Sequence, residues 1–464
     1  MFIKLVNMLI SLDFLSKFKQ NLSSNKKNKQ TYGEVFTNFN LIDQMLDLLP
    51  QTLFQNPHLK WLDPCAGTGY FMMKVYERLM KGLSTKIKAL KKRHYHIITK
   101  QLYMIEINQE HLPELFKIFG ENSNIILGNY LFFNNLKFDV IIGNPPFNVN
   151  GMIKVPTNKN TDKKKDGKTI WMDFISHSFN NLKEGGYLNF ITPSIWLKRD
   201  HKMHTRIKDC GDWIRLKCLT NTATNKVFNG EAQTPTCFFA MKKNINTSMK
   251  FELFDKVTNS YISYIPPITK SIPLCFITII QKLDKWVKQV GFINVIKTSM
   301  RPGYKGLVTG PSMCKKTPYP NIKTCILNGL QPQISVNFSN IKCAHQGQPK
   351  LVLAHKMYGF PFYDKQGLFG ISNRDNYVII HKTDKEFILL QKFLSSKLAL
   401  LVFETTRYRM KYLEKYAFEF LPDITKIKEF PDMFDENILF DFFNFNDLER
   451  KAINYLHKKQ YLSF

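Results

Sequence analysis

The stretch Trp61–Leu83, WLDPCAGTGYFMMKVYERLMKGL, has the pattern of a strand, a glycine-rich turn and a helix. The apolar start ends at Asp63, Gly67 and Gly69 fall in the turn, and apolar residues then recur at helical intervals. Glycine lets the backbone approach a ligand, and a helix beginning there offers free N–H groups. Such turns are also common without a ligand, so a purely structural role stays open.

Further strand patterns follow along the chain. They are QLYMIEIN (101–108), NIILGNYL (124–131), FDVIIGNPPF (138–147) and YLNFITPSIWL (187–197). Before the last of them, WMDFISHSFNNLKEGG (171–186) predicts a helix that stops at its glycines. This alternation predicts an α/β fold with a parallel sheet and helices on both faces, whose ligands bind at the carboxyl ends of the strands.

Glu106 stands at the end of the second strand. A carboxylate there can accept hydrogen bonds from both hydroxyls of a ribose. The turn at Gly67 lacks the third glycine and the spacing of the dinucleotide motif G-x-G-x-x-G. We therefore expect a nucleoside ligand rather than a dinucleotide.

The fourth strand ends abruptly in Asn144-Pro145-Pro146-Phe147. Two adjacent prolines fix two φ angles and remove two backbone donors, so the chain must leave the sheet in a rigid turn. If the nucleoside carries an activated methyl group, the Asn144 oxygen and the Pro145 carbonyl could accept the N–H groups of an amine such as adenine N6 as positive charge develops. Phe147 would stack on a base that has left the duplex.

Several motifs in this order resemble one known family. DPCAGTGYF (63–71), YMIEIN (103–108), GNPPF (143–147) and TPSIW (192–196) resemble the N6-adenine DNA methyltransferases whose cofactor motifs precede the catalytic motif. The sequence is most similar to adenine-specific modification methylases of type II restriction systems and large DNA viruses. TYGEVFTNFNLIDQML (31–46) resembles the N-terminal cofactor motif of that family, usually written GEVFTP. The resemblance covers roughly residues 31–242 and implies a Rossmann-like S-adenosylmethionine-dependent methyltransferase fold with a C-terminal mixed α+β target-recognition domain.

The resemblance also implies which residues form the sites. The cofactor-binding residues would be Thr37, Asp63, Pro64, Ala66, Gly67, Gly69, Phe71, Glu106, Ile107, Asn129, Tyr130 and Asn144. The catalytic residues would be Asn144, Pro145, Pro146 and Phe147. Asn129 stands where an aspartate is usual, and its amide can both accept from and donate to adenine. Asn38 stands where a proline is usual, and neither departure touches the catalytic turn.

A later segment, NKVFNGEAQTPTCFFAMKK (225–243), resembles the hairpin that carries the family's second aromatic for the flipped base. Phe228 is the matching position. A second interpretation places Phe228 in the core, in a chain with 39 phenylalanines. Residues 148–169, NVNGMIKVPTNKNTDKKKDGKT, predict a Lys-rich loop that closes over the base and touches phosphates, with a merely solvated loop as the alternative.

Charge points to a polyanionic partner. The 464 residues include 66 Lys+Arg against 37 Asp+Glu, a net charge of +29. A composition inherited from an A·T-rich genome is the alternative. No acidic residue lies between Asp284 and Asp364, a segment that contains Lys297, Arg301, Lys305, Lys315, Lys316, Lys323, Lys342, Lys350 and Lys356. This segment predicts a surface that faces phosphates and base edges.

The length predicts several domains. We expect an N-terminal helix and linker (1–30), a catalytic domain (31–250) and a DNA target-recognition domain with a helical tail (251–464). Recognition strands are expected at PKLVLAH (349–355) and NYVIIH (376–381), and one helix at FLSSKLALLVFETTRY (393–408). The candidate DNA-binding residues are Lys163, Lys164, Lys165, Lys315, Lys316, Lys356, Arg374 and Arg407.

The N-terminal MFIKLVNMLISLDFLSKF (1–18) predicts an amphipathic helix too short and too charged to span a membrane, followed by the polar linker NLSSNKKNKQ (21–30). The eight cysteines are scattered without a C-x-x-C pair, which predicts a reducing compartment, no disulfide framework and no metal. We expect a cytoplasmic monomer, in a bacterium or a virus-infected cell, without membrane association.

Three functional hypotheses remain. The favoured one is a site-specific adenine-N6 methyltransferase that acts on a flipped adenine in double-stranded DNA, with a separately encoded restriction endonuclease as a compatible partner. The second is an RNA adenine or protein-glutamine methyltransferase, since N-P-P-[FY] also occurs there; the long C-terminal region disfavours it. The third is a non-catalytic DNA-binding subunit, disfavoured by the intact Asn144, Pro145, Phe147 and Glu106.

Overall fold

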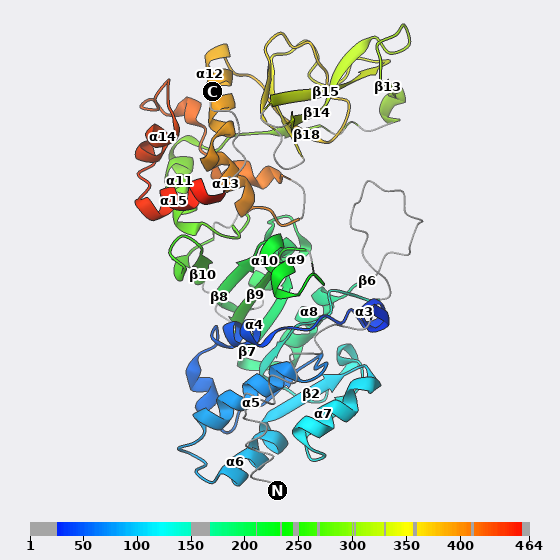
Figure 1. Cartoon of the computed structure of the whole chain (residues 1–464), viewed down its shortest axis with the longest axis vertical. Helices are drawn as coiled ribbons and strands as arrows, with labels where there is room; N and C mark the ends of the chain where they lie inside the picture. The colour runs from blue at the N-terminus through cyan, green and yellow to red at the C-terminus, as the bar shows by residue number, and fades with distance from the viewer. Residues whose placement is uncertain are drawn as a thin grey trace. The chain divides into compact units, whose positions relative to one another are not determined.

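A computed structural model gives the architecture of the chain (Figure 1). It divides into two units, each described by itself: unit 1 comprises Met1–Trp196, Asp200–Leu253 and Ser263–Ile265, and unit 2 comprises Leu197–Arg199, Phe254–Ile262 and Pro266–Phe464. The expected helix at residues 1–18 lies outside the described residues. The structure describes residues 26–149, 168–209, 211–232, 234–244, 250–266, 270–298, 300, 303–328, 331–355, 360–409 and 413–456.

A nine-stranded sheet organises unit 1, in the order β11-β10-β8-β9-β7-β4-β1-β2-β3. Its strands are β1 (Trp61–Asp63), β2 (Leu102–Glu106), β3 (Asn124–Leu127), β4 (Phe138–Gly143), β7 (Leu182–Pro193), β8 (Asp212–Leu219), β9 (Thr236–Lys242), β10 (Phe251–Asp255) and β11 (Ser260–Tyr264). The predicted α/β class is confirmed, and β1, β2, β3, β4 and β7 pair in parallel as expected.

β9 lies in the segment expected to form a hairpin, outside the strands predicted to be parallel. This strand runs antiparallel to both β7 and β8. Leu219 at the end of β8 pairs with Thr236 at the start of β9, so the chain turns back at the same edge of the sheet. Since a strand buried on both faces has a continuous apolar sequence in either direction, the residues of β9 did not reveal its orientation.

Helices cover the sheet at its parallel strands. α5 (Tyr70–Gly82) packs against β2, α7 (Leu112–Phe119) against β3, and α8 (Trp171–Asn181) against β7. α8 ends at Asn181 rather than at the expected glycines, which lie inside β7. A Cβ at Gly186 would lie 3.0 Å from the Asp139 carbonyl oxygen, so this glycine permits close strand contact instead of stopping the helix.

Among the described residues, two short α-helices precede β1. α3 (Lys26–Tyr32) occupies the end of the segment expected to be a polar linker, so the linker prediction is wrong there. α4 (Phe39–Leu46) begins after Asn38, whose side chain accepts a hydrogen bond from the Leu41 N–H at 2.9 Å. Asn38 therefore has a local use as the helix N-cap at the position where the resembling family has proline.

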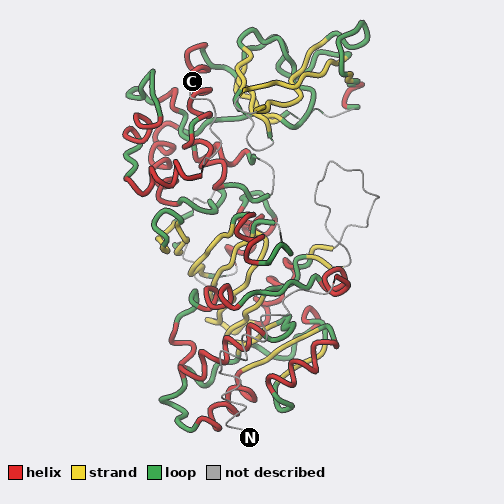
Figure 2. The backbone as a smooth tube through the Cα atoms, viewed as in Figure 1, coloured by secondary structure: helices red, strands yellow, loops and turns green. Residues whose placement is uncertain are grey.

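Unit 2 combines two small sheets with helices (Figure 2). The sheets have the orders β12-β18-β16-β17 and β13-β15-β14. Their strands are β12 (Ile296–Lys297), β13 (Thr309–Gly310), β14 (Tyr319–Asn328), β15 (Gln331–Ser339), β16 (Lys350–Ala354), β17 (Phe362–Asp364) and β18 (Asn376–Ile379). The helices are α11 (Ile277–Val290), α12 (Asp384–Ser395), α13 (Lys397–Thr405), α14 (Glu436–Phe442) and α15 (Asp447–Leu456).

The strands expected at 349–355 and 376–381 are confirmed as β16 and β18. The single helix expected at 393–408 is wrong, because α12 ends at Ser395 and α13 begins after Ser396. The Ser396 hydroxyl accepts a hydrogen bond from the Ala399 N–H at 3.2 Å, which starts the second helix. Within the described part of the chain, no helix has both the length and the apolar character needed to cross a membrane.

Lys350 differs from the other lysines of the acid-free segment. It is fully buried, and its Nζ lies 2.6 Å from Oδ2 of Asp364. The backbone N–H groups of Leu368 and Phe369 also donate to Asp364, at 2.9 and 3.0 Å. The inclusion of Lys350 in a phosphate-facing surface is therefore wrong, because its charge is held by a buried carboxylate.

We expect Lys350→Met to lower the free energy of unfolding by about 3 kcal/mol, because it leaves the buried carboxylate of Asp364 without its cation. Lys365→Met is the matched control, since Lys365 pairs with Asp384 at an exposed position and should cost at most about 1 kcal/mol. Urea unfolding followed by circular dichroism measures both. Equal losses in the two variants would contradict the structural role of Lys350.

Candidate functional site

A cavity of about 430 Å³ lies where β1, β2 and β4 end, a size typical of small-molecule sites. Many of the expected residues line it, and the structure thus brings them together: Thr37, Pro64, Ala66, Gly67, Phe71, Glu106, Ile107, Asn129, Tyr130, Asn144 and Pro146. Four expected residues, Asp63, Gly69, Pro145 and Phe147, are not in its lining but adjoin lining residues in the chain.

The glycine turn and Glu106 form one cradle. Glu106 is buried, and its carboxylate accepts hydrogen bonds from the Gly67 N–H at 2.6 Å and the Asn108 N–H at 2.8 Å. Gly67 has φ +54°, and a Cβ placed on it would meet nothing within 4 Å. The turn therefore leaves open space beside a backbone conformation that favours glycine, which suits the close approach of a ligand.

Gly69 serves packing instead. It has φ +86°, and an added Cβ would lie 2.8 Å from the ring of Phe119 and 2.9 Å from Leu115. Both of these side chains belong to α7. The second glycine of the turn thus lets the start of α5 approach α7, and it has no place in the cavity lining.

Asp63 lies behind the cradle. Its side chain is fully buried, and Oδ1 accepts a hydrogen bond from the Cys65 N–H at 3.0 Å. Burial raises the pKa of Asp63 to about 7, and the charge of Glu106 acts in the same direction, while the hydrogen bond from Cys65 opposes the shift. Asp63 therefore shapes the turn from below rather than facing the cavity.

The Asn144 side chain is held in one orientation. Its Nδ2 donates to the Val35 carbonyl at 3.2 Å and to the Thr37 hydroxyl at 3.1 Å. Both amide hydrogens have partners, so the remaining polar atom of the side chain is the acceptor Oδ1. Phe147 is half-buried beside the cavity, and its carbonyl accepts a hydrogen bond from the N–H of the lining residue Ile170 at 3.2 Å.

The residues after β3 add an apolar wall. Asn129 Oδ1 accepts a hydrogen bond from the Leu131 N–H at 3.0 Å. Tyr130 is buried, with its hydroxyl 3.0 Å from Ser178 Oγ and its ring centroid 5.6 Å from that of Phe174. Ile107 is 48% exposed and also lines the cavity. Apolar side chains of this kind suit a planar ring.

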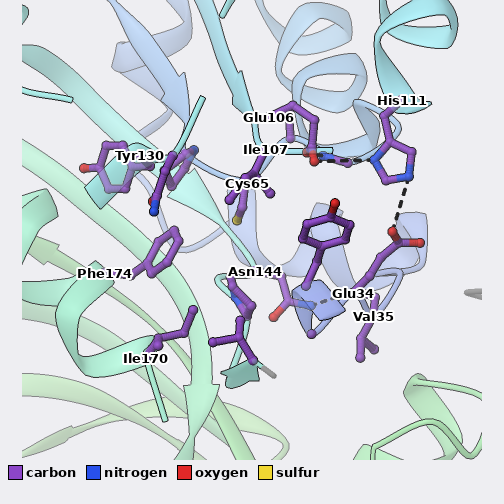
Figure 3. A pocket seen from close by; sticks show the side chains of 18 of the residues that line it. Glu34, Val35, Cys65, Glu106, Ile107, His111, Tyr130, Asn144, Ile170 and Phe174 are labelled. Carbon is purple, nitrogen blue, oxygen red and sulfur yellow. Dashed lines mark hydrogen bonds and ion pairs between the residues drawn. The ribbon is translucent and has the colours of Figure 1, made fainter. Parts of the chain in front are cut away.

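Within the segment expected to be a cofactor motif, the sequence predicts only Thr37 as a cofactor contact. Seven consecutive residues, Thr31–Thr37, border the cavity, and we call this segment the strap. His111 joins the strap to the cradle: its Nε2 lies 3.3 Å from Glu34 Oε2, and its Nδ1 lies 3.6 Å from Glu106 Oε1 (Figure 3). Tyr130 and Phe174 lie on the opposite side of the pocket in this view.

The two carboxylates keep His111 positively charged. Burial lowers the pKa of His111, but the ion pairs with the negatively charged Glu106 and Glu34 outweigh it and raise the pKa to about 10. The presence of Glu34 in the GEVFTN motif was the one available signal. Sequence spacing could not show that its side chain meets a histidine beyond β2.

The other predicted residues lie away from the cavity lining. Phe228 is 2% exposed at the end of α10 (Asn221–Val227), so its stacking role stays a prediction. Lys315, Lys316 and Arg374 are exposed in unit 2. Arg407 is ion-paired with Glu404 at 3.1 Å. The predictions for Lys163, Lys164, Lys165 and Lys356 fall outside the described residues.

Fold and cavity together define an α/β domain in which the cradle of Gly67 and Glu106 and the Asn-Pro-Pro-Phe turn lie at one sheet edge. Residues 69–228 match the family described as "Eco57I restriction-modification methylase", which confirms the resemblance. This part of the chain is therefore similar to restriction-modification methylase domains.

Curated relatives agree with this match. "Type II methyltransferase M.BstVI" of Geobacillus stearothermophilus is 24% identical over 50% of this chain and 46% of its own. An "adenine-specific methylase" of Mycoplasma pneumoniae is 40% identical over 16% of this chain and 19% of its own. "Modification methylase CviBIII" of Paramecium bursaria Chlorella virus NC1A is 27% identical over 38% and 41%. The chain thus spans less than half the length of each of these relatives.

We expect Asp63→Asn to change how stability depends on pH. The folded pKa of about 7 lies above the ordinary value of 3.8, so the wild-type free energy of unfolding should fall as the pH rises from about 4 to about 7. The asparagine variant lacks this titration. Urea unfolding should therefore show that the variant gains about 1–3 kcal/mol relative to the wild type between pH 4 and pH 8. A constant difference would contradict the raised pKa.

Proposed function

We propose that the protein is a site-specific DNA adenine-N6 methyltransferase that uses S-adenosylmethionine. The observation that carries the proposal is the meeting of Asn144 with the cradle of Gly67 and Glu106 in one cavity. A nucleoside cradle and a pair of rigid acceptors for an amine are the two parts that such a transfer needs. The match of residues 69–228 to a restriction-modification methylase family supports the proposal.

The cavity suits S-adenosylmethionine in its donors, acceptors and walls. Each oxygen of the Glu106 carboxylate accepts one backbone N–H, and Oε2 has a further lone pair for a ribose hydroxyl. Ile107 and Tyr130 would flank the adenine ring, and Asn129 would meet its polar edge. When bound, the cofactor supplies a methyl group on a positively charged sulfur, which a neutral amine can attack.

Asn144 and Pro145 would stabilise the amine as it reacts. Positive charge develops on N6 as its bond to the methyl carbon forms and the carbon–sulfur bond breaks, and the nitrogen then releases one proton. Asn144 Oδ1 and the Pro145 carbonyl are acceptors for the two N–H groups during this change. The strap holds the Asn144 amide through Val35 and Thr37, so the acceptor is oriented before the base arrives.

Double-stranded DNA is the proposed partner. The net charge of +29 favours a polyanion, and exposed Lys315, Lys316 and Arg374 provide cations for phosphates or base edges. Phe147 would stack on the extruded adenine beside the cavity. A separately encoded restriction endonuclease would share the DNA site with a monomeric methyltransferase.

Incubation with labelled S-adenosylmethionine and, separately, duplex DNA, structured RNA and protein tests the substrate. We expect the label in N6-methyladenine after nuclease digestion of the DNA. Label in RNA or in protein glutamine, with none in DNA, would overturn the proposal. A wild-type protein that transfers no label but binds DNA would support a non-catalytic subunit instead.

We expect Asn144→Ala to lower kcat by about 10²–10³-fold, because an acceptor for the developing charge is lost. The dissociation constant for S-adenosylmethionine, measured by calorimetry, should change only a few-fold. Asn180→Ala is the matched control, since Asn180 is exposed on α8 and should leave both values unchanged. Turnover retained by Asn144→Ala would show that the proposed acceptor role is wrong.

A further inference from the structure

We infer that His111 is a positioning residue, an imidazolium clip that ties the strap to Glu106 and so assembles the cofactor side of the cavity. The inference rests on the proposed function, because it takes the cavity to bind S-adenosylmethionine. His111 would touch neither the cofactor's reacting atoms nor the base. It would act through the two carboxylates that it joins.

The strap reaches three separate parts of unit 1. Near its middle, a Cβ at Gly33 would lie 2.2 Å from the Asn148 carbonyl oxygen, which shows how closely the strap passes β5 (Asn148–Val149). At its end, Thr37 and Val35 accept the amide hydrogens of Asn144. Between these contacts, Glu34 reaches across to His111. The strap therefore connects the cradle to the catalytic turn through contacts on both sides of the cavity.

Charge and burial make the middle contact strong. The side chains of Glu34 and His111 are each 11% exposed, and that of Glu106 is 7% exposed. The charge of Glu114, on α7, also interacts with the charge of His111. The positive charge of Lys117 partly offsets the negative charge of Glu114. A neutral ring would leave several carboxylates close together with little solvent, so the charged ring is the form that the site favours.

The clip also fixes the acceptors of Glu106. Oε1 faces both the Asn108 N–H and the His111 ring, and Oε2 accepts the Gly67 N–H. These contacts prevent the Glu106 side chain from rotating freely. The direction of the lone pair that stays free on the carboxylate is therefore set by the cradle. Without the ring charge, Glu106 can rotate and Glu34 loses its partner, which frees the strap from the cradle. The main effect should be a lower affinity for the cofactor, and the disturbance of the Asn144 alignment should be smaller.

Three variants of the full chain test the clip: His111→Gln, Glu34→Gln and the double variant. Calorimetry at pH 7.5 should show a dissociation constant for S-adenosylmethionine about 10-fold larger in each single variant than in the wild type. The double variant should have a dissociation constant close to that of either single variant, because both substitutions remove the same interaction. At saturating cofactor, kcat should fall by less than the affinity does. His94→Gln is the matched control: His94 lies 2.9 Å from the Tyr76 hydroxyl, is not part of the cavity lining and should leave the affinity unchanged.

Chemical rescue separates charge from packing. In His111→Gly, added imidazole should restore affinity at pH 6, where it is protonated, and lose this effect at pH 9. Pyrazole, a ring of the same shape that stays neutral, should not restore it. Equal rescue by the two rings would overturn the role of the charge and leave only packing.

The outcomes also distinguish this inference from the proposed function. If the wild-type protein does not bind S-adenosylmethionine, the proposed function itself is wrong. Wild-type binding with unchanged affinity in folded His111→Gln, or with fully additive losses in the double variant, would overturn the clip alone. If His111→Gln fails to fold, Glu34→Gln, which keeps the imidazole, tests the clip by the same measurement.

Discussion

The site depends on the buried carboxylate of Glu106. A carboxylate with so little solvent is stable only when donors meet its oxygens, and here they come from the turn after β1, from the backbone beyond β2 and from His111. These contacts hold the glycine turn against the second strand. They also place the two carboxylate oxygens of Glu106, which are hydrogen-bond acceptors, at the edge of the sheet where β1, β2 and β4 end.

The turn at residues 144–147 obtains its order from two sources. Pro145 and Pro146 restrict the backbone, which keeps the carbonyl of Pro145 in place without further contacts. The side chain of Asn144 has no such restriction and could rotate by half a turn. Hydrogen bonds to the strap exclude that rotation, because the Val35 carbonyl can only accept and so requires the amide nitrogen on that side.

Charge in unit 2 has more than one use. The sequence of the acid-free segment predicts a uniform cationic surface. Lys350 within it, however, is buried and ion-paired with Asp364, the residue at which the segment ends. Arg407, outside the segment, is likewise held by Glu404. Lys315 and Lys316 are exposed and remain compatible with DNA. A count of basic residues therefore overstates the charge that a polyanion can meet, because part of it is neutralised inside the fold.

The sequence by itself determined the strand–turn–helix at Trp61–Leu83, the parallel strands that follow it, and the meeting of Gly67, Glu106 and Asn144 at one edge. It could do so because strand ends of a parallel sheet converge whatever the loops do. Tertiary structure alone decided the direction of β9, the burial of Phe228, and the contact of Glu34 with His111. These features depend on how segments distant in sequence approach one another. An apolar strand has the same sequence whether it is parallel or antiparallel, and a histidine has the same sequence context whether or not it contacts a distant glutamate.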